Sequence, residues 1–426
     1  MITDRPATLA AIASCVDGYD PNALPIDRAR EFIDRLVPRL NAIEVLPLRA
    51  ALGRTLARDI ISDIDVPAHD NSAMDGYALR GADLRADGDT VLHVAGSGLA
   101  GEKFEGVAGS GQCVRIMTGA VMPAGLDTVV PQEFVRQENG AVVIPAGILR
   151  QGDNRRLAGE DLARGEPALS AGRVLRPADI GMLASLGRGE VPVRRRVRVA
   201  FFSTGNELRS IGEPLDEGCV YDSNRYTLWC MLQRLGVEIL DMGVVRDDEA
   251  TLEEAFAAAA ANADVVITSG GVSVGEADYT KKVMARLGDV LFWKIAMRPG
   301  RPLAIGRIGQ AILFGLPGNP VAVMVTFYAL VRDALLAMGG AEPQALPLLR
   351  CVTPKPIRKK PGRTEYQRAI VTRAEDGGWQ AAITGSQGSG ILRSMSQANG
   401  LLVLGHEQGN IAAGEYVDVL PFDGLI

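Results

Sequence analysis

Three glycine-containing loops each follow an apolar run that is typical of a buried strand. They are STGNEL (203–208) after VAFF, SGGVSVG (269–275) after VVIT, and LPGNP (316–320) after AILFG. Glycine lets the backbone approach a ligand closely, and successive backbone N–H groups can turn toward an anion. The third loop leads into a predicted helix beginning PVAV, whose N-terminal dipole could face the same site. One such turn is often only structural, but three in one sheet favour a crevice for phosphate or another oxyanion at the carboxyl ends of the strands.

Positive charge is concentrated in the segment WKIAMRPGRP (293–302), which contains Lys294, Arg298 and Arg301. Proline fixes the backbone of the turn, so these side chains are presented at little ordering cost. Guanidinium groups also match the geometry of tetrahedral oxyanions. Charged runs usually face solvent, so a fully solvated loop is the alternative. The neighbouring glycine loops favour oxyanion binding.

Acidic residues beside the same loops are candidate ligands for Mg²⁺. They are Glu207, Asp247, Asp248, Glu276 and Asp278. Mg²⁺ usually binds one or two carboxylates together with phosphate oxygens of its ligand, and sparse acids beside phosphate loops meet that requirement. Asp247 and Asp248 also precede the predicted helix TLEEAF, so they could instead cap it. Both interpretations stay open.

Two further motifs carry more polar residues than a hairpin needs. HDNSAMDGYAL (69–79) includes Asp75, and RIMTGAVMPAGLDTVVPQE (115–133) puts Thr118 in a turn ahead of Glu133. Ordinary turn chemistry explains either motif taken alone.

The composition excludes several classes of protein. The 426 residues suggest about three domains. Lys and Arg total 45 against 51 Asp and Glu, so the net charge of −6 provides no basic field for nucleic acid or an anionic membrane. Five dispersed cysteines, no CxxC pair and three histidines argue against a zinc site or a disulfide framework. No N-terminal apolar region and no apolar stretch approaching about 18 residues is found, which predicts a cytoplasmic protein without a membrane span.

Hydrophobic patterns divide the chain into segments. Within ALPIDRAREFIDRLVPRL (23–40), apolar residues recur at helical spacing and predict one amphipathic helix. Short β-branched runs separated by glycine up to about residue 145 predict an all-β insert, and Pro177 marks the first turn of another helix. Alternating strand and helix patterns over 198–337 predict a largely parallel sheet covered by helices. Short strands after 342 predict a small β-barrel or sandwich.

Eight motifs, in this order, carry a resemblance to a known family: DNSAMDGYA, RIMTGA, AGEDLARG, STGNEL, YDSNRYTL, TSGGVSVGEADYTK, KIAMRPGRP and LFGLPGNPVA. Together they resemble the molybdenum insertases, also called molybdopterin molybdenumtransferases (MoeA), to which the E domain of gephyrin belongs. The match covers essentially the whole chain. It implies the final step of molybdenum cofactor assembly: adenylylated molybdopterin and molybdate are bound, the phosphoanhydride is cleaved with the help of Mg²⁺, AMP leaves, and molybdenum enters the dithiolene.

The resemblance also implies an architecture, a multidomain α/β plus all-β fold. Its expected parts are a discontinuous N-terminal helical and linker domain (1–45 and 150–195), a β-rich insert domain (46–149), a three-layer, MogA-like, molybdopterin-binding α/β domain (196–342) and a C-terminal β-barrel domain (343–426). The family works as a homodimer whose cleft lies between the α/β domain of one subunit and the β domain of the other.

Site residues are carried over position by position. The resemblance implies catalytic roles for Asp75, Thr118, Asp161, Glu207 and Asp278. It implies binding of the adenylylated molybdopterin or molybdate by Ser269, Gly270, Gly271, Ser273, Lys294, Arg298, Arg301, Pro317, Asn319, Pro320, Arg363 and Ser386. It implies metal ligation by Glu207, Asp247 and Asp278.

The chain departs from the family pattern at several positions. Arg298 and Arg301 stand where many relatives have lysines in a KPGKP turn, which keeps the charge and changes the hydrogen-bond geometry. Asn206 replaces a common acid and so removes one possible metal ligand. The C-terminal motifs match more loosely, so Arg368 and Ser394 are candidates there alongside Arg363 and Ser386.

Three other functions compete with this interpretation. The molybdopterin adenylyltransferase that acts one step earlier resembles the α/β region, but it is typically a single domain without the MDGYA and PGRP segments. A scaffold role follows from the gephyrin relative, and a non-catalytic nucleotide carrier is the third alternative. The adenylyltransferase and acceptor molybdoenzymes are candidate partners.

Overall fold

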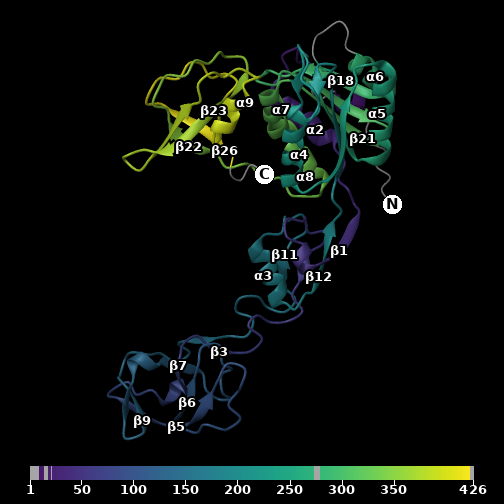
Figure 1. The fold of residues 1–426 in the computed structure, drawn as a ribbon. Coiled ribbons are helices and arrows are strands. Elements are labelled where there is room, and N and C mark those ends of the chain that lie inside the picture. Colours follow the sequence, from purple (N-terminus) through teal and green to yellow (C-terminus); the bar gives the residue numbers. More distant parts are fainter. Residues whose placement is uncertain (1–8, 14–17, 21, 273–278, 423–426) are drawn as a thin grey trace. The chain divides into compact units, whose positions relative to one another are not determined.

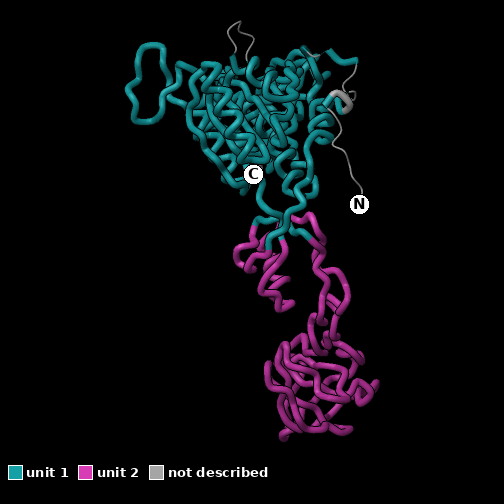
Figure 2. Tube along the Cα trace, turned by 90° about the vertical axis from the view of Figure 1, so that its right-hand side faces the viewer, with its two compact units in different colours: residues 1–44, 53–57, 193–426 teal, residues 45–52, 58–192 magenta. Residues whose placement is uncertain are grey.

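The computed structural model describes residues 9–13, 18–20, 22–272 and 279–422. The chain divides into two compact units (Figure 2). Unit 1 contains residues 1–44, 53–57 and 193–426, and unit 2 contains residues 45–52 and 58–192.

Unit 1 is built around a six-stranded sheet. Its strands lie in the order β16 (Glu238–Val245), β13 (Arg198–Thr204), β17 (Val265–Ser269), β21 (Ala311–Leu316), β20 (Pro302–Ile308) and β18 (Gly288–Lys294). The first four are parallel to one another, while β20 runs antiparallel to both β21 and β18. The largely parallel sheet predicted for this segment is therefore confirmed.

Helices cover both faces of this sheet (Figure 1). One core contains residues of α1 (Leu9–Ala13), α2 (Ile26–Leu36), α4 (Ser223–Leu235), α7 (Pro320–Thr326) and α8 (Arg332–Met338), and the other contains residues of α5 (Glu249–Asn262) and α6 (Tyr279–Leu287). Neighbouring residues of β13 separate between them, with Phe201 in the first core and Phe202 in the second. Successive side chains of a strand face opposite sides, so the expected three-layer α/β domain is confirmed.

Helix α2 is the amphipathic helix predicted from the N-terminal pattern. Its apolar residues Ala29, Phe32, Ile33 and Leu36 are buried. The ring of Phe32 packs edge-on against Trp293 of β18, with centroids 4.7 Å apart. The helical spacing of these residues thus fixes α2 against the sheet.

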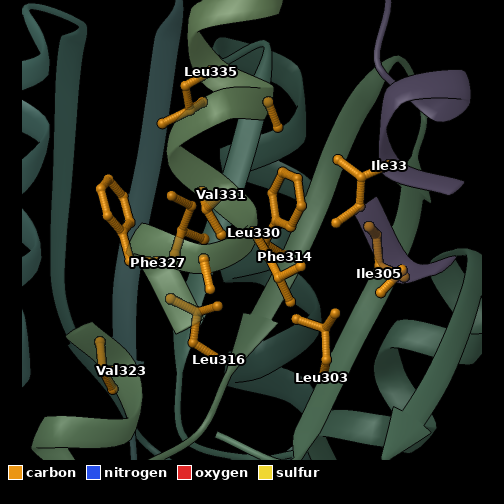
Figure 3. Close-up of a cluster of buried hydrophobic side chains, with 14 of the residues drawn as sticks. Ile33, Leu303, Ile305, Phe314, Leu316, Val323, Phe327, Leu330, Val331 and Leu335 are labelled. Atoms are coloured by element: carbon orange, nitrogen blue, oxygen red, sulfur yellow. The ribbon is translucent and has the colours of Figure 1, made fainter. Parts of the chain in front are cut away.

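The stretch Pro320–Met338 is the longest apolar helix among the candidates for a membrane span in the described residues. It combines α7, a π-helical turn (Phe327–Val331) and α8, and its 18-residue window has a mean hydropathy of 1.8. By length and composition it could cross a membrane, but Thr326, Arg332 and Asp333 interrupt its apolar residues, so it is not an unbroken apolar stretch. Moreover, 67% of the window is buried inside the protein, where Phe327 and Val331 pack in one cluster with Phe314 (Figure 3). A helix buried in a large core is apolar all round and meets the same criteria.

The C-terminal part of unit 1 is a closed five-stranded β-barrel. Its strands follow the order β23 (Thr364–Arg373), β24 (Trp379–Ile383), β22 (Leu349–Val352), β26 (Tyr416–Pro421) and β25 (Gly400–Leu404), and β25 pairs back with β23. The short strand β19 (Met297–Arg298) pairs with the start of β23. Because β19 belongs to the basic turn, the barrel directly supports the predicted cationic segment.

Unit 2 contains the predicted all-β insert. Its main sheet has the order β7 (Thr128–Pro131), β4 (Gly76–Leu79), β6 (Gln112–Ile116), β5 (Thr90–Gly98), β9 (Ala141–Ile144) and β8 (Arg136–Glu138). Smaller pairs join β3 (Asn71–Ser72) to β10 (Arg155–Arg156) and β2 (Ile60–Ile61) to β11 (Pro167–Leu169). Helix α3 (Pro177–Ser185) begins at Pro177, as predicted. The structure groups α2 with the α/β sheet and α3 with unit 2, and the division into four domains stays a prediction.

Candidate active site

A pocket of about 770 Å³ lies at the carboxyl edge of the sheet in unit 1. Its walls come from the loops after β13, β17 and β21, which are adjacent parallel strands. Nine residues that sequence analysis assigned to the site line it: Glu207, Asp247, Ser269, Gly270, Gly271, Arg298, Arg301, Pro317 and Asn319. The three loops therefore meet at one place, as their positions after parallel strands predicted.

Close packing explains why glycine follows β17, because a side chain at either position would collide with neighbouring atoms. Gly270 and Gly271 have φ values of 95° and 65°. A Cβ on Gly270 would lie 2.5 Å from the Thr204 carbonyl oxygen, and one on Gly271 would lie 2.3 Å from Thr280 Oγ1. The Gly270 N–H donates to the Leu316 carbonyl at 3.1 Å. The expectation that these glycines turn their N–H groups toward an anion is therefore wrong for Gly270.

The later part of the same motif contains three predicted positions that lie outside the described residues. They are Ser273, Glu276 and Asp278. Their roles stay predictions.

At the start of α7, one backbone N–H group also forms its hydrogen bond within the protein. Pro320 has no N–H group, and the Val321 N–H donates to the Ser389 carbonyl at 3.0 Å. Ser389 itself lines the pocket, whereas Pro320 is not among the lining residues. The Val321 N–H is therefore not available to a ligand.

The basic turn presents its two arginines to the pocket. Arg298 and Arg301 are both exposed and both line it. In the part of the chain that the structure describes, the Arg298 guanidinium makes no ion pair or hydrogen bond, and Arg301 Nη2 donates only to the Asn22 carbonyl at 3.3 Å. Lys294 ends β18 opposite Pro302 and does not line the pocket. The arginines thus retain donors for an anionic ligand.

A glycine lets this turn pack closely against α7. Gly300 has φ of 95°. A Cβ there would lie 2.3 Å from Thr326 Oγ1, and Thr326 is fully buried. No residue with a side chain fits without displacing the turn.

A buried guanidinium lies behind the pocket. Arg368 of β23 is 1% exposed, and its donors reach Ser394 Oγ at 3.0 Å and the Gly388 carbonyl at 2.9 Å. Among the described residues it has no carboxylate partner. Burial lowers the pKa of Arg368 to about 10, and the positive charge of Arg298 adds to this shift. The unneutralised charge raises the electrostatic potential of the pocket.

The barrel loop that reaches the pocket contains the predicted Ser386, but the residues that follow Ser386 line the pocket. Gln387, Gly388 and Ser389 line the pocket, whereas Ser386 lies beside them with its carbonyl accepting a hydrogen bond from Arg368 at 3.3 Å. Arg363, the other predicted residue here, pairs with the buried Glu365 at 2.7 Å. The roles predicted for Arg363 and Ser386 stay predictions. Sequence analysis missed Gln387 and Ser389, although both lie in the segment GSQGSG.

The neighbouring acids Asp247 and Asp248, each a candidate for metal binding or helix capping, have different surroundings in the structure. Asp248 caps α5, because its carboxylate accepts a hydrogen bond from the Thr251 N–H at 3.0 Å, and that bond lowers its pKa. Asp247 instead lines the pocket, where the Thr280 hydroxyl donates to it at 3.4 Å. The carboxylate of Glu207 lies 2.6 Å from where a Gly205 Cβ would be. Only one of the two aspartates therefore faces the pocket.

The donor set of the pocket is compatible with Mg²⁺. Glu207 and Asp247 supply two carboxylates, and the described residues contain no group of three His, Cys, Asp or Glu side chains arranged to hold a metal. Mg²⁺ is commonly bound by one or two carboxylates with the remaining positions filled by water and substrate oxygens. The residues fit an ion that the substrate helps to hold.

The predicted acids of unit 2 have distinct surroundings. Asp75 Oδ1 accepts hydrogen bonds from both the N–H and the hydroxyl of Thr118, each at 2.7 Å. The backbone bond first and the hydroxyl bond second lower the pKa of Asp75, so it stays ionised. Asp161 is exposed, and its N–H donates to the Val66 carbonyl at 3.1 Å. The structure joins Asp75 to Thr118 and places Asp161 in a separate turn.

Family comparisons cover nearly the whole chain. Residues 24–187 match the MoeA N-terminal region (domain I and II), residues 200–337 match the probable molybdopterin binding domain, and residues 350–422 match the MoeA C-terminal region (domain IV).

Individual relatives agree with these matches. A molybdopterin molybdenumtransferase from Haemophilus influenzae is 42% identical over 404 residues, which is 95% of this chain and 100% of the relative. Another from Nostoc sp. is 39% identical over 413 residues, or 94% of each protein. The crystal structure of the molybdopterin biosynthesis moeA protein from Pyrococcus horikoshii OT3 superposes with a TM-score of 0.82 at 29% identity, covering 94% of this chain and 100% of that chain. Identity at this level along nearly the full length means that the chain belongs to the molybdopterin molybdenumtransferase family.

Proposed function

We propose that this chain uses Mg²⁺ to insert molybdenum from molybdate into adenylylated molybdopterin, with release of AMP. Its family makes it a transferase of molybdenum cofactor biosynthesis. The observation that supports the finer proposal is the pocket of unit 1, which combines arginines lacking carboxylate partners among the described residues with two carboxylates suited to Mg²⁺. Such a site suits substrates that carry several negative charges, as an adenylylated pterin phosphate and molybdate do.

The arginines would hold and orient the anionic groups. Arg298 and Arg301 each offer several N–H donors in a fixed plane, which matches the oxygens of phosphate or molybdate. Arg368 would act through charge, because its own donors are used by Ser394 and by the loop that carries Gly388. Positioned donors of this kind stabilise charge as it develops and require no reorganisation during the reaction.

Glu207 and Asp247 would hold Mg²⁺, with Asp278 as a third candidate outside the described residues. When bound, the ion would neutralise charge on the phosphoanhydride oxygens. Glu207 follows β13 and Asp247 follows β16, which are neighbouring strands. The two carboxylates would therefore keep the ion at the wall that these strand ends form.

The remaining predicted residues belong to a proposed homodimer in the cytoplasm. In that assembly, Asp75, Thr118 and Asp161 would come from the other subunit and complete the cleft. Asp75 would stay an ionised carboxylate in that cleft, because the two hydrogen bonds that Oδ1 accepts lower its pKa. Ser273, Lys294, Pro320, Arg363 and Ser386 are proposed to contact the substrate, as the resemblance implies.

The decisive experiment is single-turnover release of AMP from purified adenylylated molybdopterin. It is run with and without Mg²⁺ and molybdate, and cofactor formation is followed by activating an apo-molybdoenzyme. AMP release that needs Mg²⁺ and molybdate, together with active cofactor, supports the proposal. Tight binding without AMP release or cofactor would contradict it and favour a nucleotide carrier or scaffold.

A further inference from the structure

Asn224 joins two of the loops that form the pocket. It is the second residue of α4, is 7% exposed, and lines the pocket. Its Nδ2 donates to Ser269 Oγ at 2.8 Å and to the Gly318 carbonyl at 2.6 Å. Ser269 ends β17 and Gly318 follows β21, so one amide group holds the two strand ends together.

The orientation of this amide follows from its partners. The Gly318 carbonyl can only accept a hydrogen bond, so the NH₂ group must face it and Oδ1 must face the other way. Within the described residues, Oδ1 is buried and has no partner. A buried acceptor without a partner carries a free-energy cost. The two hydrogen bonds that Nδ2 donates hold the side chain in this orientation despite that cost.

The amide also limits the groups to which the Ser269 hydroxyl can donate a hydrogen bond. Ser269 is 1% exposed and lines the pocket. Because its oxygen accepts from Nδ2, its hydrogen cannot be donated to that nitrogen and has to point to another acceptor. No such acceptor is found for it in the described parts of the chain. The hydroxyl therefore keeps one donor for a ligand.

We propose that Asn224 is a positioning residue that fixes the Ser269 hydroxyl as a donor to a phosphate oxygen of the substrate. The inference rests on the proposed function, because it takes the ligand to be adenylylated molybdopterin. The charges near the hydroxyl agree with an anionic acceptor: Arg298 lines the same pocket without an ion pair among the described residues, and Arg368 lies behind it. The same amide keeps the loop at Gly318 in register with Ser269.

The test is a double-mutant cycle on the full chain. Dissociation constants for adenylylated molybdopterin and single-turnover rates of AMP release are measured for N224A, S269A and N224A/S269A. Each single variant should bind roughly tenfold to a hundredfold more weakly, because each removes or misdirects a hydrogen bond to a charged oxygen. The double variant should lose less affinity than the two single losses added together, because part of the effect of Asn224 acts through Ser269. The rate at saturating substrate should change less than the affinity does.

A matched control uses another asparagine of the same unit. Asn262 is exposed at the end of α5 and donates its amide to the Ala258 carbonyl at 2.8 Å. N262A should bind and react like the wild type.

A second variant covers the case in which N224A fails to fold. N224D keeps the shape of the side chain but replaces the donor by an acceptor, so the Ser269 hydroxyl would turn toward residue 224 and away from the ligand. It should lose affinity at least as strongly as N224A, and N262D on the surface should not.

The outcomes separate the two proposals. An active wild type in which N224A and N224D bind normally, or in which the losses of the single variants add, overturns the role of Asn224 alone. A wild type that neither binds adenylylated molybdopterin nor releases AMP overturns the proposed function, and this inference falls with it.

Discussion

The pocket of unit 1 and the Asp75–Thr118 turn of unit 2 differ in whether their charged side chains have partners within the protein. In the pocket, Arg298 and Arg368 lack carboxylate partners among the described residues, so positive charge is left for a ligand. In the turn, two donors of Thr118 surround one carboxylate and keep it ionised. The first arrangement is suited to hold an anion, and the second is suited to keep an acid in its basic form.

The two regions also differ in the use of the backbone. In the pocket, the N–H groups of Gly270 and Val321 donate to carbonyls of the protein, so these two backbone donors are not available to a ligand. In the turn, the Thr118 N–H itself makes the larger contribution to the acidity of Asp75. Side-chain substitutions should therefore have large effects in the pocket and small effects in the turn.

The largest effect is expected at the buried guanidinium. Arg368→Met should weaken binding of adenylylated molybdopterin by roughly 100-fold, because it removes charge from behind the pocket and frees the loop at Gly388. Loss of its donors to buried carbonyls should also lower the free energy of unfolding by about 1–3 kcal/mol. Binding assays and urea unfolding measure the two effects.

The control for this prediction lies on the same strand. Arg373 is exposed and stacks on Trp379 at 4.3 Å, so Arg373→Met should change neither quantity much. Equal effects at the two arginines would mean that the pocket does not depend on the buried charge.

A smaller effect is expected at the proposed metal ligand. Glu207→Gln should raise the Mg²⁺ concentration needed for half-maximal AMP release by roughly tenfold to a hundredfold, because it removes one carboxylate charge from the site. Asp248→Asn, which keeps an acceptor for the cap of α5, should leave this concentration unchanged. An unaltered Mg²⁺ dependence in Glu207→Gln would remove Glu207 from the ion site.

Two glycines test how far the arginines depend on close packing. Gly300→Ala places a Cβ against Thr326 Oγ1, whereas a Cβ added at Gly309, a hairpin residue with φ of 60°, would meet nothing within 4 Å. Gly309→Ala should cost only about 1–2 kcal/mol of stability for its left-handed backbone. Gly300→Ala should be less stable than that and should raise the KM for substrate by about tenfold, because Arg298 and Arg301 shift. Similar KM values for the two variants would count against the role of the turn.

The smallest effect is expected in unit 2. Thr118→Ala removes the hydroxyl bond to Asp75 and keeps the backbone bond, so the pKa of Asp75 should rise toward its usual value without reaching it. A depressed pKa stabilises the fold above the unfolded pKa, and this contribution is lost as pH falls through the folded pKa. In the variant the contribution should therefore be smaller, and its loss should be complete at a higher pH. NMR titration of the Asp75 carboxyl carbon measures the shift, and the titration of Asp127 should not change. An unchanged Asp75 curve would show that the hydroxyl bond is not formed in solution.

Local patterns were sufficient for much of the fold. The spacing of Phe32 and Ile33 predicted α2, Pro177 predicted the start of α3, and the order of apolar runs predicted the parallel strands that bring Ser269 and Pro317 to one edge. Periodicity reports which face of an element is buried, and this information is contained in a few consecutive residues. The span Pro320–Met338 shows the limit, because composition alone does not distinguish a core helix from a membrane helix.

By itself, the sequence determined the family, the order of strands and helices, and the loops in which polar and charged residues would meet, because each of these depends on near neighbours along the chain. Tertiary structure alone decided that Asp247 faces the pocket while Asp248 caps a helix, that the Gly270 N–H binds Leu316, and that Asn224 holds Ser269. The partner of a hydrogen bond is chosen by which groups are left nearby after the core has packed. Those groups come from distant parts of the chain, and no local pattern contains them.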